Sequence, residues 1–249
     1  GATDSRGVQT TAAVTVTVTG VNDAPTPDDD VAAAAEDGPP VAIAVLEDDT
    51  DRDGDAVTVV SVAGAALAVG STATLASGAT VALGADGTLT YDPAGAFESL
   101  AAGETAEDSF AYGVADGAGA TGEATVTVTV SGADDLATPA DDLAEVVEDA
   151  TVTGDVTAND TDPDASDVLE VASIDGDAAG VGAPVAGEFG TLTLNADGTF
   201  SYAADLADAF VGGESGTDVF AYALSDGTGA TLTVQVAGAD ETLRGGTAD

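Results

Sequence analysis

The sequence contains no cysteine, histidine, lysine or tryptophan, and each absence removes a class of function. Without cysteine the chain has no disulfide and no redox thiol. It also lacks the nitrogen and sulfur ligands that zinc prefers, and the histidine, cysteine and lysine side chains that most often act as catalytic bases or nucleophiles. Three arginines stand against 46 acidic residues, so the formal net charge is −43. We therefore expect no binding to nucleic acid or to anionic membranes.

What is present argues for folded domains, because apolar residues make up 44% of the chain and an acidic disordered tail would have far fewer. Neighbouring carboxylates roughly 6 Å apart repel by about 0.7 kcal/mol per pair even in bulk water. Divalent cations or high salt must therefore neutralise them. The sequence has no starting methionine, signal peptide or long uncharged apolar stretch, so we expect no membrane insertion and interpret it as an internal piece of a larger secreted or surface protein.

Acidic pairs return along the chain at an offset of 112 residues. Asn22-Asp23 recurs as Asp134-Asp135, and Glu36-Asp37 recurs as Glu148-Asp149. Apolar positions would repeat merely to rebuild a core, but surface carboxylates have no such reason. Their repetition indicates that each unit binds the same cation.

Strand patterns set the expected domain boundaries. Residues 14–19, 125–130 and 231–236 alternate strictly between apolar and polar residues, so each should form a strand that buries one face. Each run is followed by glycine and an acidic or amide pair. We expect residues 1–20 to be the last strands of a preceding, truncated repeat, 21–132 and 133–238 to be two complete domains, and 239–249 to be a tail.

Turns and aromatic residues suggest the fold within each domain. Asp86-Gly87 and Asp197-Gly198 lie between apolar runs, where Asp-Gly favours a tight primed turn. Tyrosine and phenylalanine then recur at alternate positions, which predicts inward-facing side chains. About seven short strands in roughly 110 residues are typical of an immunoglobulin-like β-sandwich. The predicted fold class is all-β, with two such sandwiches in tandem.

The strongest chemical signal is a run of alternating aspartates in each domain. Alternate carboxylates around a tight turn converge on one hard cation, and Ca²⁺ takes about 6–8 oxygen ligands. An EF-hand is excluded because Val60 and Val171 stand where its last glutamate ligand is needed. Mg²⁺ is an alternative that prefers fewer protein ligands. The candidate calcium ligands are Asp23, Glu36, Asp37, Asp49, Asp51, Asp53, Asp55, Asp116, Asp134, Asp135, Glu148, Asp149, Asp160, Asp162, Asp164, Asp167, Asp226 and Asp240.

Two readings without calcium stay open at this point. Aspartate-rich turns can be ordinary solvated loops, and extreme acidity without lysine also fits a halophile, in which charge serves solubility. Catalysis has little support. A glycosidase needs one carboxylate pair, whereas here the acids are repeated in both units. We therefore predict that the protein is not an enzyme.

Several motifs resemble the VCBS repeats and cadherin-like domains of large bacterial surface proteins and RTX adhesins. The motifs are Val21-Asn22-Asp23-Ala24-Pro25, Glu36-Asp37, residues 159–164, residues 195–202, and Phe220 to Gly227. The resemblance implies calcium-binding, cadherin-like Greek-key sandwiches that act as an extender or adhesive segment outside the cell. The sequence departs from the pattern at Ala165-Ser166, where glycine is expected, and at Glu47-Asp48. Residues 243–249 resemble the opening of an RTX nonapeptide, which fits type I secretion.

These features lead to one mechanism and two alternatives. A calcium ion held between Asp134-Asp135 and the flanking domains would fix the angle between neighbouring repeats and make the tandem stiff. Alternatively, residues 1–20 could pair with a neighbouring molecule by strand addition and build a filament or matrix. A carbohydrate-binding module is the third reading. It is disfavoured because the chain has only four tyrosines and six phenylalanines, most of them at inward positions.

Overall fold

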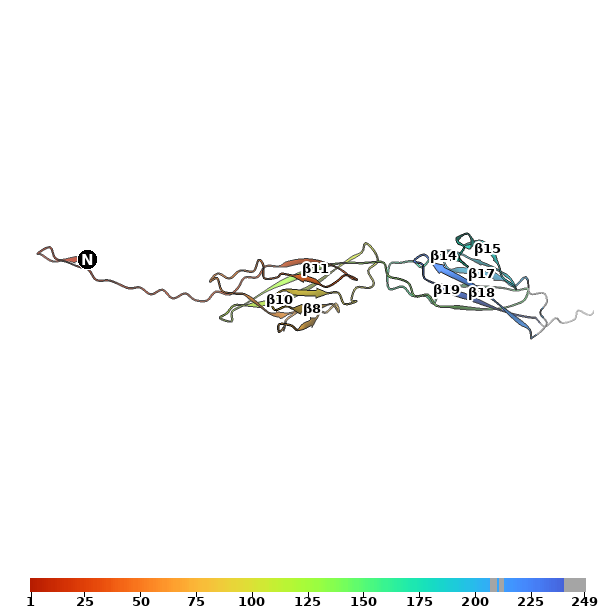
Figure 1. The fold of residues 1–249 in the computed structure, drawn as a ribbon, viewed down its shortest axis with the longest axis horizontal. Coiled ribbons are helices and arrows are strands. Elements are labelled where there is room, and N and C mark those ends of the chain that lie inside the picture. Colours follow the sequence, from red (N-terminus) through yellow and green to blue (C-terminus); the bar gives the residue numbers. More distant parts are fainter. Residues whose placement is uncertain (207–209, 211–212, 240–249) are drawn as a thin grey trace, which may run out of the picture. The chain divides into compact units, whose positions relative to one another are not determined.

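The computed structural model describes residues 1–206, 210 and 213–239. Apart from a single 3-10 turn, η1 (Ala178–Gly180), every regular element in these residues is a β-strand (Figure 1). The all-β prediction is confirmed. No helix in the described part of the chain has the length and apolar character needed to cross a membrane.

The first sandwich has a five-stranded sheet in the order β3-β11-β10-β5-β6 and a four-stranded sheet in the order β4-β9-β8-β7. Across the two sheets, the Tyr91 ring stacks on Phe110 with 6.4 Å between ring centroids. Tyr91 and Tyr112 are fully buried, as predicted from their alternate spacing. The strands are β3 (Asp30–Ala35), β4 (Val41–Ile43), β5 (Thr58–Val62), β6 (Ala65–Ala66), β7 (Thr72–Thr74), β8 (Thr80–Leu83), β9 (Leu89–Asp92), β10 (Thr105–Ala115) and β11 (Thr121–Ser131).

The second sandwich repeats this plan, with sheets in the orders β12-β19-β18-β14 and β13-β17-β16-β15. β12 runs parallel to β19, whereas β18 pairs with β19 antiparallel. Leu232 of one sheet and Leu192 and Tyr202 of the other belong to one core cluster. The strands are β12 (Asp142–Val147), β13 (Thr151–Asp155), β14 (Val171–Ile174), β15 (Pro184–Ala186), β16 (Thr191–Leu194), β17 (Thr199–Ala203), β18 (Ser215–Leu224) and β19 (Gly229–Ala237).

Two of the three alternating runs form the predicted strands. β11 buries Val126, Val128 and Val130, and β19 buries Leu232, Val234 and Val236. The prediction was wrong for residues 14–19, which carry no strand; only a short hairpin of β1 (Ala2–Thr3) and β2 (Gln9–Thr10) precedes them. A strand needs neighbouring strands for its backbone hydrogen bonds, and in the described chain β11 and β19 already occupy the corresponding places in the two sandwiches.

The turn at Asp86-Gly87 differs in type from the predicted primed turn. Gly87 has a positive φ of 87°, but Asp86 is not among the residues with positive φ. The Gly87 amide donates to Gly84 O, and the Gly84 amide donates to Thr88 O. This is a type I turn followed by a glycine bulge, a common three-residue hairpin connection. The Asp86 carboxylate favours it because it accepts a hydrogen bond from the Thr88 amide at 3.1 Å.

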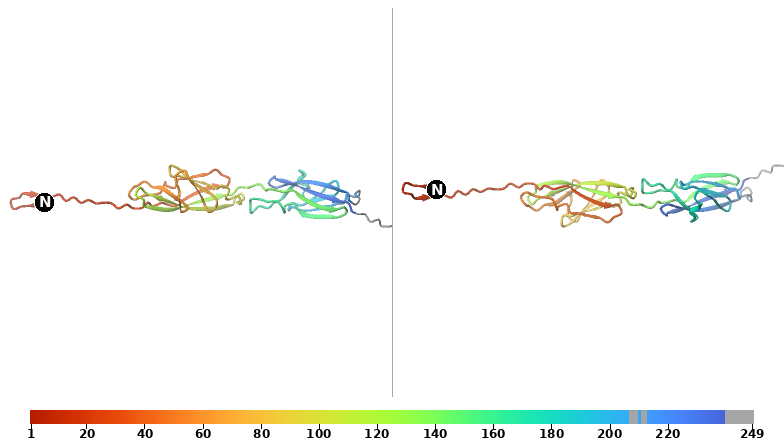
Figure 2. Two further views of the ribbon diagram at one scale, coloured as in Figure 1. Left: turned by 90° about the horizontal axis from the view of Figure 1, so that it is seen from below. Right: turned by 90° about the horizontal axis from the view of Figure 1, so that it is seen from above.

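The chain divides into two compact units. The first contains Gly1–Ala32, Pro40–Asp92 and Asp108–Val128, and the second contains Ala33–Pro39, Pro93–Glu107 and Thr129–Asp249. Figure 2 shows the strands of each sandwich from two further sides. Glu36, Asp37 and Glu98 therefore belong to the same unit as the acids between residues 134 and 167.

Candidate metal centre

Two groups of three carboxylates in the second unit lie close enough to share a cation. One group is Asp37, Glu98 and Asp135, and the other is Asp134, Asp164 and Asp167. In each group, one oxygen atom from every residue lies within 4.8 Å of the others. Asp37 follows β3, and Glu98 lies between β9 and β10. Asp134 and Asp135 follow β11, whereas Asp164 and Asp167 lie in the loop between β13 and β14.

Hydrogen bonds within the aspartate run shape this loop. The Asp164 amide donates to Asp162 Oδ1 at 2.9 Å, which is the local turn that aspartate side chains favour. Asp164 Oδ2 in turn accepts the Asp135 amide at 2.8 Å. The alternating spacing thus brings Asp162 and Asp164 to the segment that follows β11.

Several oxygen atoms here are buried without a hydrogen-bond donor. Glu36 is only 4% exposed and Asp164 only 2%. Glu36 Oε1 accepts the Ala133 amide at 2.5 Å, but its Oε2 has no partner among the described residues, and neither do Asp135 Oδ2 and Asp164 Oδ1. A buried carboxylate oxygen without a donor is costly. Cations held by the two carboxylate groups would compensate the Asp135 and Asp164 oxygens.

The electrostatics of the cluster agree with this interpretation. Burial raises the pKa of Glu98, and repulsion from Asp135, Asp37 and Glu36 adds to the shift. The pKa of Asp135 is raised by the same combination, with Asp37 its strongest charged neighbour. The pKa of Asp167 is raised by burial and by Asp164. The ionised cluster is therefore unfavourable by itself, and a divalent cation would add attractions to each carboxylate that outweigh their mutual repulsion and lower their pKa values.

A related arrangement lies in the first unit. The Asp23 amide donates to Asp53 Oδ2 at 2.6 Å, and the Asp53 amide donates to Asp51 Oδ1 at 2.8 Å. Asp51 Oδ2 is buried without a donor among the described residues. The Asn22 side-chain amide donates to Asp116 Oδ2 at 2.7 Å, and this bond is the main reason that the pKa of Asp116 is lowered.

The remaining predicted ligands occupy varied positions. Asp226 accepts the Ala137 amide at 2.8 Å and so contacts the start of the second repeat. Asp116 makes the corresponding contact with Asn22 at the start of the first repeat. Glu148 Oε1 accepts the Ala239 amide at 2.7 Å, which copies the contact of Glu36. Asp149 has a positive φ of 64° and an exposed side chain. Asp240 lies outside the described residues.

Three further predicted ligands, Asp49, Asp160 and Asp55, belong to neither of the two carboxylate groups of the second unit. Asp49 accepts the Tyr112 hydroxyl at 3.0 Å and the Asp28 amide at 3.1 Å. Asp160 accepts the Tyr222 hydroxyl at 3.3 Å and the Ala140 amide at 2.7 Å. Isolated β-bridges pair Thr50, next to Asp49, with Thr26, and Thr161, next to Asp160, with Thr138. Backbone hydrogen bonds therefore fix the chain directly after each aspartate. Asp55 has an exposed side chain, and its amide donates to Asp51 Oδ1 at 3.5 Å.

Glu98 is the cluster member that sequence reasoning missed. The repeat offset identifies only acids that recur, and Phe210 stands 112 residues after Glu98. Two further buried acids were also missed. Asp108 accepts the Tyr91 hydroxyl at 2.9 Å, and Asp218 accepts the Tyr202 hydroxyl at 2.5 Å. The sequence pattern that could have identified them is an aspartate two residues before the inward-facing phenylalanine, Phe110 or Phe220, in each domain.

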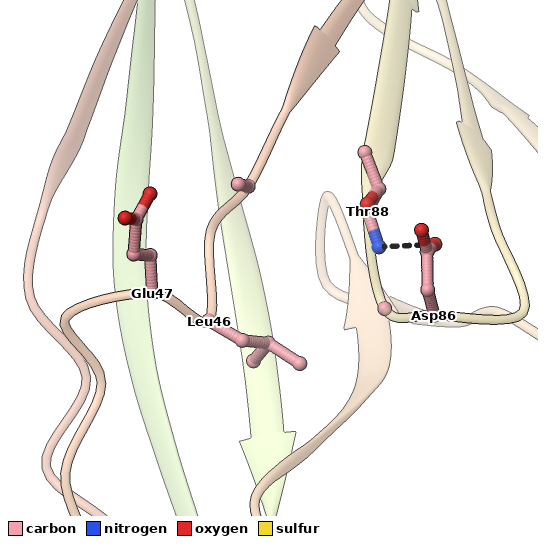
Figure 3. Close-up of a pocket in the computed structure, with 6 residues that line it drawn as sticks. Leu46, Glu47, Asp86 and Thr88 are labelled. Carbon is pink, nitrogen blue, oxygen red and sulfur yellow. Dashed lines mark hydrogen bonds between the residues drawn. The ribbon is translucent and has the colours of Figure 1, made fainter.

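A shallow hollow beside Gly87 is a separate feature (Figure 3). Ala44, Leu46, Glu47, Asp86, Gly87 and Thr88 line it, and none of these residues is aromatic. Figure 3 shows Glu47 and Asp86 on different segments with Leu46 between them, and Asp86 is bonded to the Thr88 amide. The two carboxylates do not converge as those of the second unit do.

Comparisons with known proteins agree with this architecture. A family described as bacterial cadherin-like domain matches residues 22–132 and 134–238. The structure of Drosophila N-cadherin EC1-4 is similar with a TM-score of 0.51 at 14% identity; the match covers 88% of this chain and 50% of that one. The chain thus spans about half the length of that structure. Mouse clustered PcdhgC3 EC1-3 has a TM-score of 0.48 at 17% identity, covering 88% and 69%. No curated protein matches the sequence.

Proposed function

Because the chain belongs to the bacterial cadherin-like domain family, we propose that it is a calcium-binding extender segment of an adhesive bacterial surface protein. Its two repeats correspond to residues 21–132 and 133–238. The observation that carries the proposal is the set of buried oxygens without donors, namely Glu36 Oε2, Asp135 Oδ2 and Asp164 Oδ1. Each lies on a residue that faces other carboxylates.

The donor set favours Ca²⁺ among divalent cations. All the converging ligands are oxygen atoms, which suits a hard ion and disfavours zinc. Mg²⁺ keeps several water molecules and is usually held by one or two carboxylates. Here Asp37, Glu98 and Asp135 converge in one group, and three more aspartates converge in the other. Ca²⁺ accommodates such crowded and irregular oxygen sets best.

Ions at these groups would restrain the linker between the two matched segments. Asp37 and Glu98 come from the first matched segment, whereas Asp135 and Asp164 come from the second. Without the ions, repulsion among these carboxylates would free the linker. With the ions, the segments would keep one relative orientation, which is what an extender requires. We place the segment outside the cell, where calcium is plentiful, with type I secretion as its route. Residues 240–249, which carry the RTX-like motif, lie outside the described residues.

Calcium titration of the full chain tests the proposal. We expect calorimetry to detect binding both at physiological salt and at molar NaCl, because buried ligation is screened little by salt. Asp164→Asn should remove at least one ion, while Asp55→Asn, which makes the same charge change at an exposed position, should leave the binding unchanged. Chelation should lower the melting temperature and shorten the mean end-to-end distance in solution scattering.

The contrary outcomes are equally definite. Calcium binding that disappears at molar salt would be a diffuse counterion effect. It would support the alternative in which the acidic residues serve solubility, as in a halophile. Equal losses in Asp164→Asn and Asp55→Asn would show that the clusters are not the binding sites. Scattering curves that do not change when calcium is chelated would contradict the extender role even if ions bind.

A further inference from the structure

The first ten residues form a hairpin whose turn resembles the turn between β10 and β11, the last two strands of the first sandwich. In the turn between β10 and β11, the Asp116 amide donates to Ala120 O at 3.1 Å and the Gly119 amide donates to Asp116 O at 3.3 Å. In the hairpin of β1 and β2, the Asp4 amide donates to Val8 O and the Gly7 amide to Asp4 O, both at 3.0 Å. Both turns also have an aspartate whose side chain accepts the following backbone amides.

The segment after this hairpin has the pattern of a closing strand but lacks its surroundings. Val14, Val16 and Val18 are 85%, 77% and 86% exposed, whereas Val126, Val128 and Val130 of β11 are fully buried. Residues 11–20 carry no strand and are drawn as an extended trace (Figure 1). Three exposed valines on one face of a strand-forming sequence are a surface that favours pairing with a sheet.

The residues that follow each closing strand make a specific set of contacts. At the end of β11, Ser131 O accepts the Glu36 amide, and the next amide, that of Gly132, donates to Glu104 O. The Ala133 amide then donates to the buried Glu36 carboxylate. At the end of β19, Ala237 O accepts the Glu148 amide, and the Ala239 amide donates to the Glu148 carboxylate. Gly20 and Val21 stand in the same places after residues 14–19, and an added Cβ at Gly20 would meet nothing within 4 Å.

We propose that residues 2–21 are a donor hairpin that closes a cadherin-like sandwich whose other strands come from another stretch of polypeptide. The partner is defined by its chemistry. It offers an apolar groove between an edge strand that runs parallel to residues 14–19 and a strand that runs antiparallel to them, as β12 and β18 flank β19. It also carries a buried glutamate at the end of the edge strand, which accepts the Val21 amide. The proposal does not depend on calcium.

A fusion protein tests this directly. A second copy of residues 133–222 is joined to the amino terminus of the complete chain, so that residues 1–21 follow the added segment where its own closing hairpin would. We expect the amides of residues 14–18 to exchange at least about 100-fold more slowly than in the 249-residue chain, because exchange then requires opening of a sheet. Exchange in the fusion that is as fast as in a dilute, unprotected sample of the unfused chain overturns the proposal, whether or not the added segment folds.

Matched variants make the test specific. In the fusion, Val16→Asp should abolish the protection, because its counterpart Val234 is fully buried. Thr17→Asp should preserve it, because its counterpart Gln235 is exposed. Equal effects of the two substitutions would contradict the proposed register. In the unfused chain, neither should change the melting temperature.

The unfused chain also identifies the source of the partner. Protection of residues 14–18 that rises with protein concentration would assign the sandwich to a second molecule that accepts the hairpin in exchange for its own. Protection only in the fusion would show that the hairpin needs an acceptor joined to the same polypeptide. Either result supports the donor hairpin, and protection in neither sample excludes it.

Discussion

The Asp135 amide donates a 2.8 Å hydrogen bond to one oxygen of the Asp164 carboxylate, and the other oxygen of that buried group has no donor among the described residues. In the first unit the Asp23 amide likewise donates to Asp53 Oδ2 at 2.6 Å, although the Asp53 side chain is exposed. In both places the backbone at the start of a repeat positions an aspartate of the neighbouring loop. In the proposed calcium site, the second oxygen of Asp164 would be left available as a ligand by this hydrogen bond.

Glu98→Gln tests the ligand that only the structure identifies. Glu98 lies with Asp37 and Asp135 in one carboxylate group. We expect the calcium affinity of this group to fall at least about tenfold, since even residues that only support a metal ligand affect affinity about 10–100-fold. Glu123→Gln is the charge-matched control, because Glu123 is exposed on β11. Calorimetric titration that gives the same affinity for both variants would remove Glu98 from the site.

Tyr202→Phe tests the buried tyrosine–aspartate pair of the second sandwich. Asp218 is 5% exposed and would keep the amides of Glu188 and Phe189 as donors, but it would lose the hydroxyl. We expect the free energy of unfolding of this repeat to fall by about 1–3 kcal/mol. Tyr91→Phe should do the same to the first repeat, where Asp108 retains Ser77 at 2.7 Å. Urea denaturation curves that shift by less than about 0.5 kcal/mol would contradict a net role for these bonds.

Asp142 makes the stability of the second repeat depend on pH. Burial raises its pKa from 3.8 to about 6, partly opposed by the hydrogen bond from Tyr222 and reinforced by repulsion from Asp160. The folded state therefore binds a proton more tightly than the unfolded state. Its contribution is complete below pH 3.8 and is lost as the pH rises through about 6. In EDTA, the melting temperature of this repeat should fall between about pH 4 and pH 6 because of this group.

Asp142→Asn should flatten that dependence, because the amide resembles the protonated acid. The measurement is the melting temperature of the second repeat across the same pH window. Asp55→Asn, at an exposed loop position, should leave the slope as it is in the original protein. A slope that persists in Asp142→Asn would show that other carboxylates control it.

Gly132→Ala and Gly20→Ala form a matched pair, because Gly132 follows β11 and Gly20 follows residues 14–19, which have the same alternating pattern but carry no strand. A Cβ at Gly132 would clash with the carbonyl oxygens of Leu100 and Ala101, so the backbone would have to move. We expect this substitution to destabilise the protein by about 1–3 kcal/mol or more. Gly20→Ala, which meets nothing within 4 Å, should stay within about 0.5 kcal/mol. Chemical denaturation of both variants would measure the difference, and equal effects would contradict it.

Strand positions were predictable where the chain supplies both the alternating pattern and the neighbouring strands that pair with it. The alternation of Val126 to Val130 predicted the buried face of β11 because side chains on a strand alternate with a period of two. The same alternation at Val14 to Val18 failed, because a pattern specifies which face is apolar but not which strands will cover it. The inward aromatics Tyr91 and Tyr202 were likewise predictable, but their buried partners Asp108 and Asp218 were not, since each pair joins opposite sheets.

By itself, the sequence determined that this is an acidic, all-β tandem with carboxylates repeated at equivalent places, because strand period and repeat offset are properties of the linear chain. Only the tertiary structure decided which carboxylates meet. It separated Asp49 and Asp160, whose oxygens accept tyrosine hydroxyls, from Asp162 and Asp164, and it added the unrepeated Glu98 to the cluster. The physical reason is that a carboxylate group's role depends on the donors and charges a few ångströms away, and the chain path around the sandwich brings those together from distant segments.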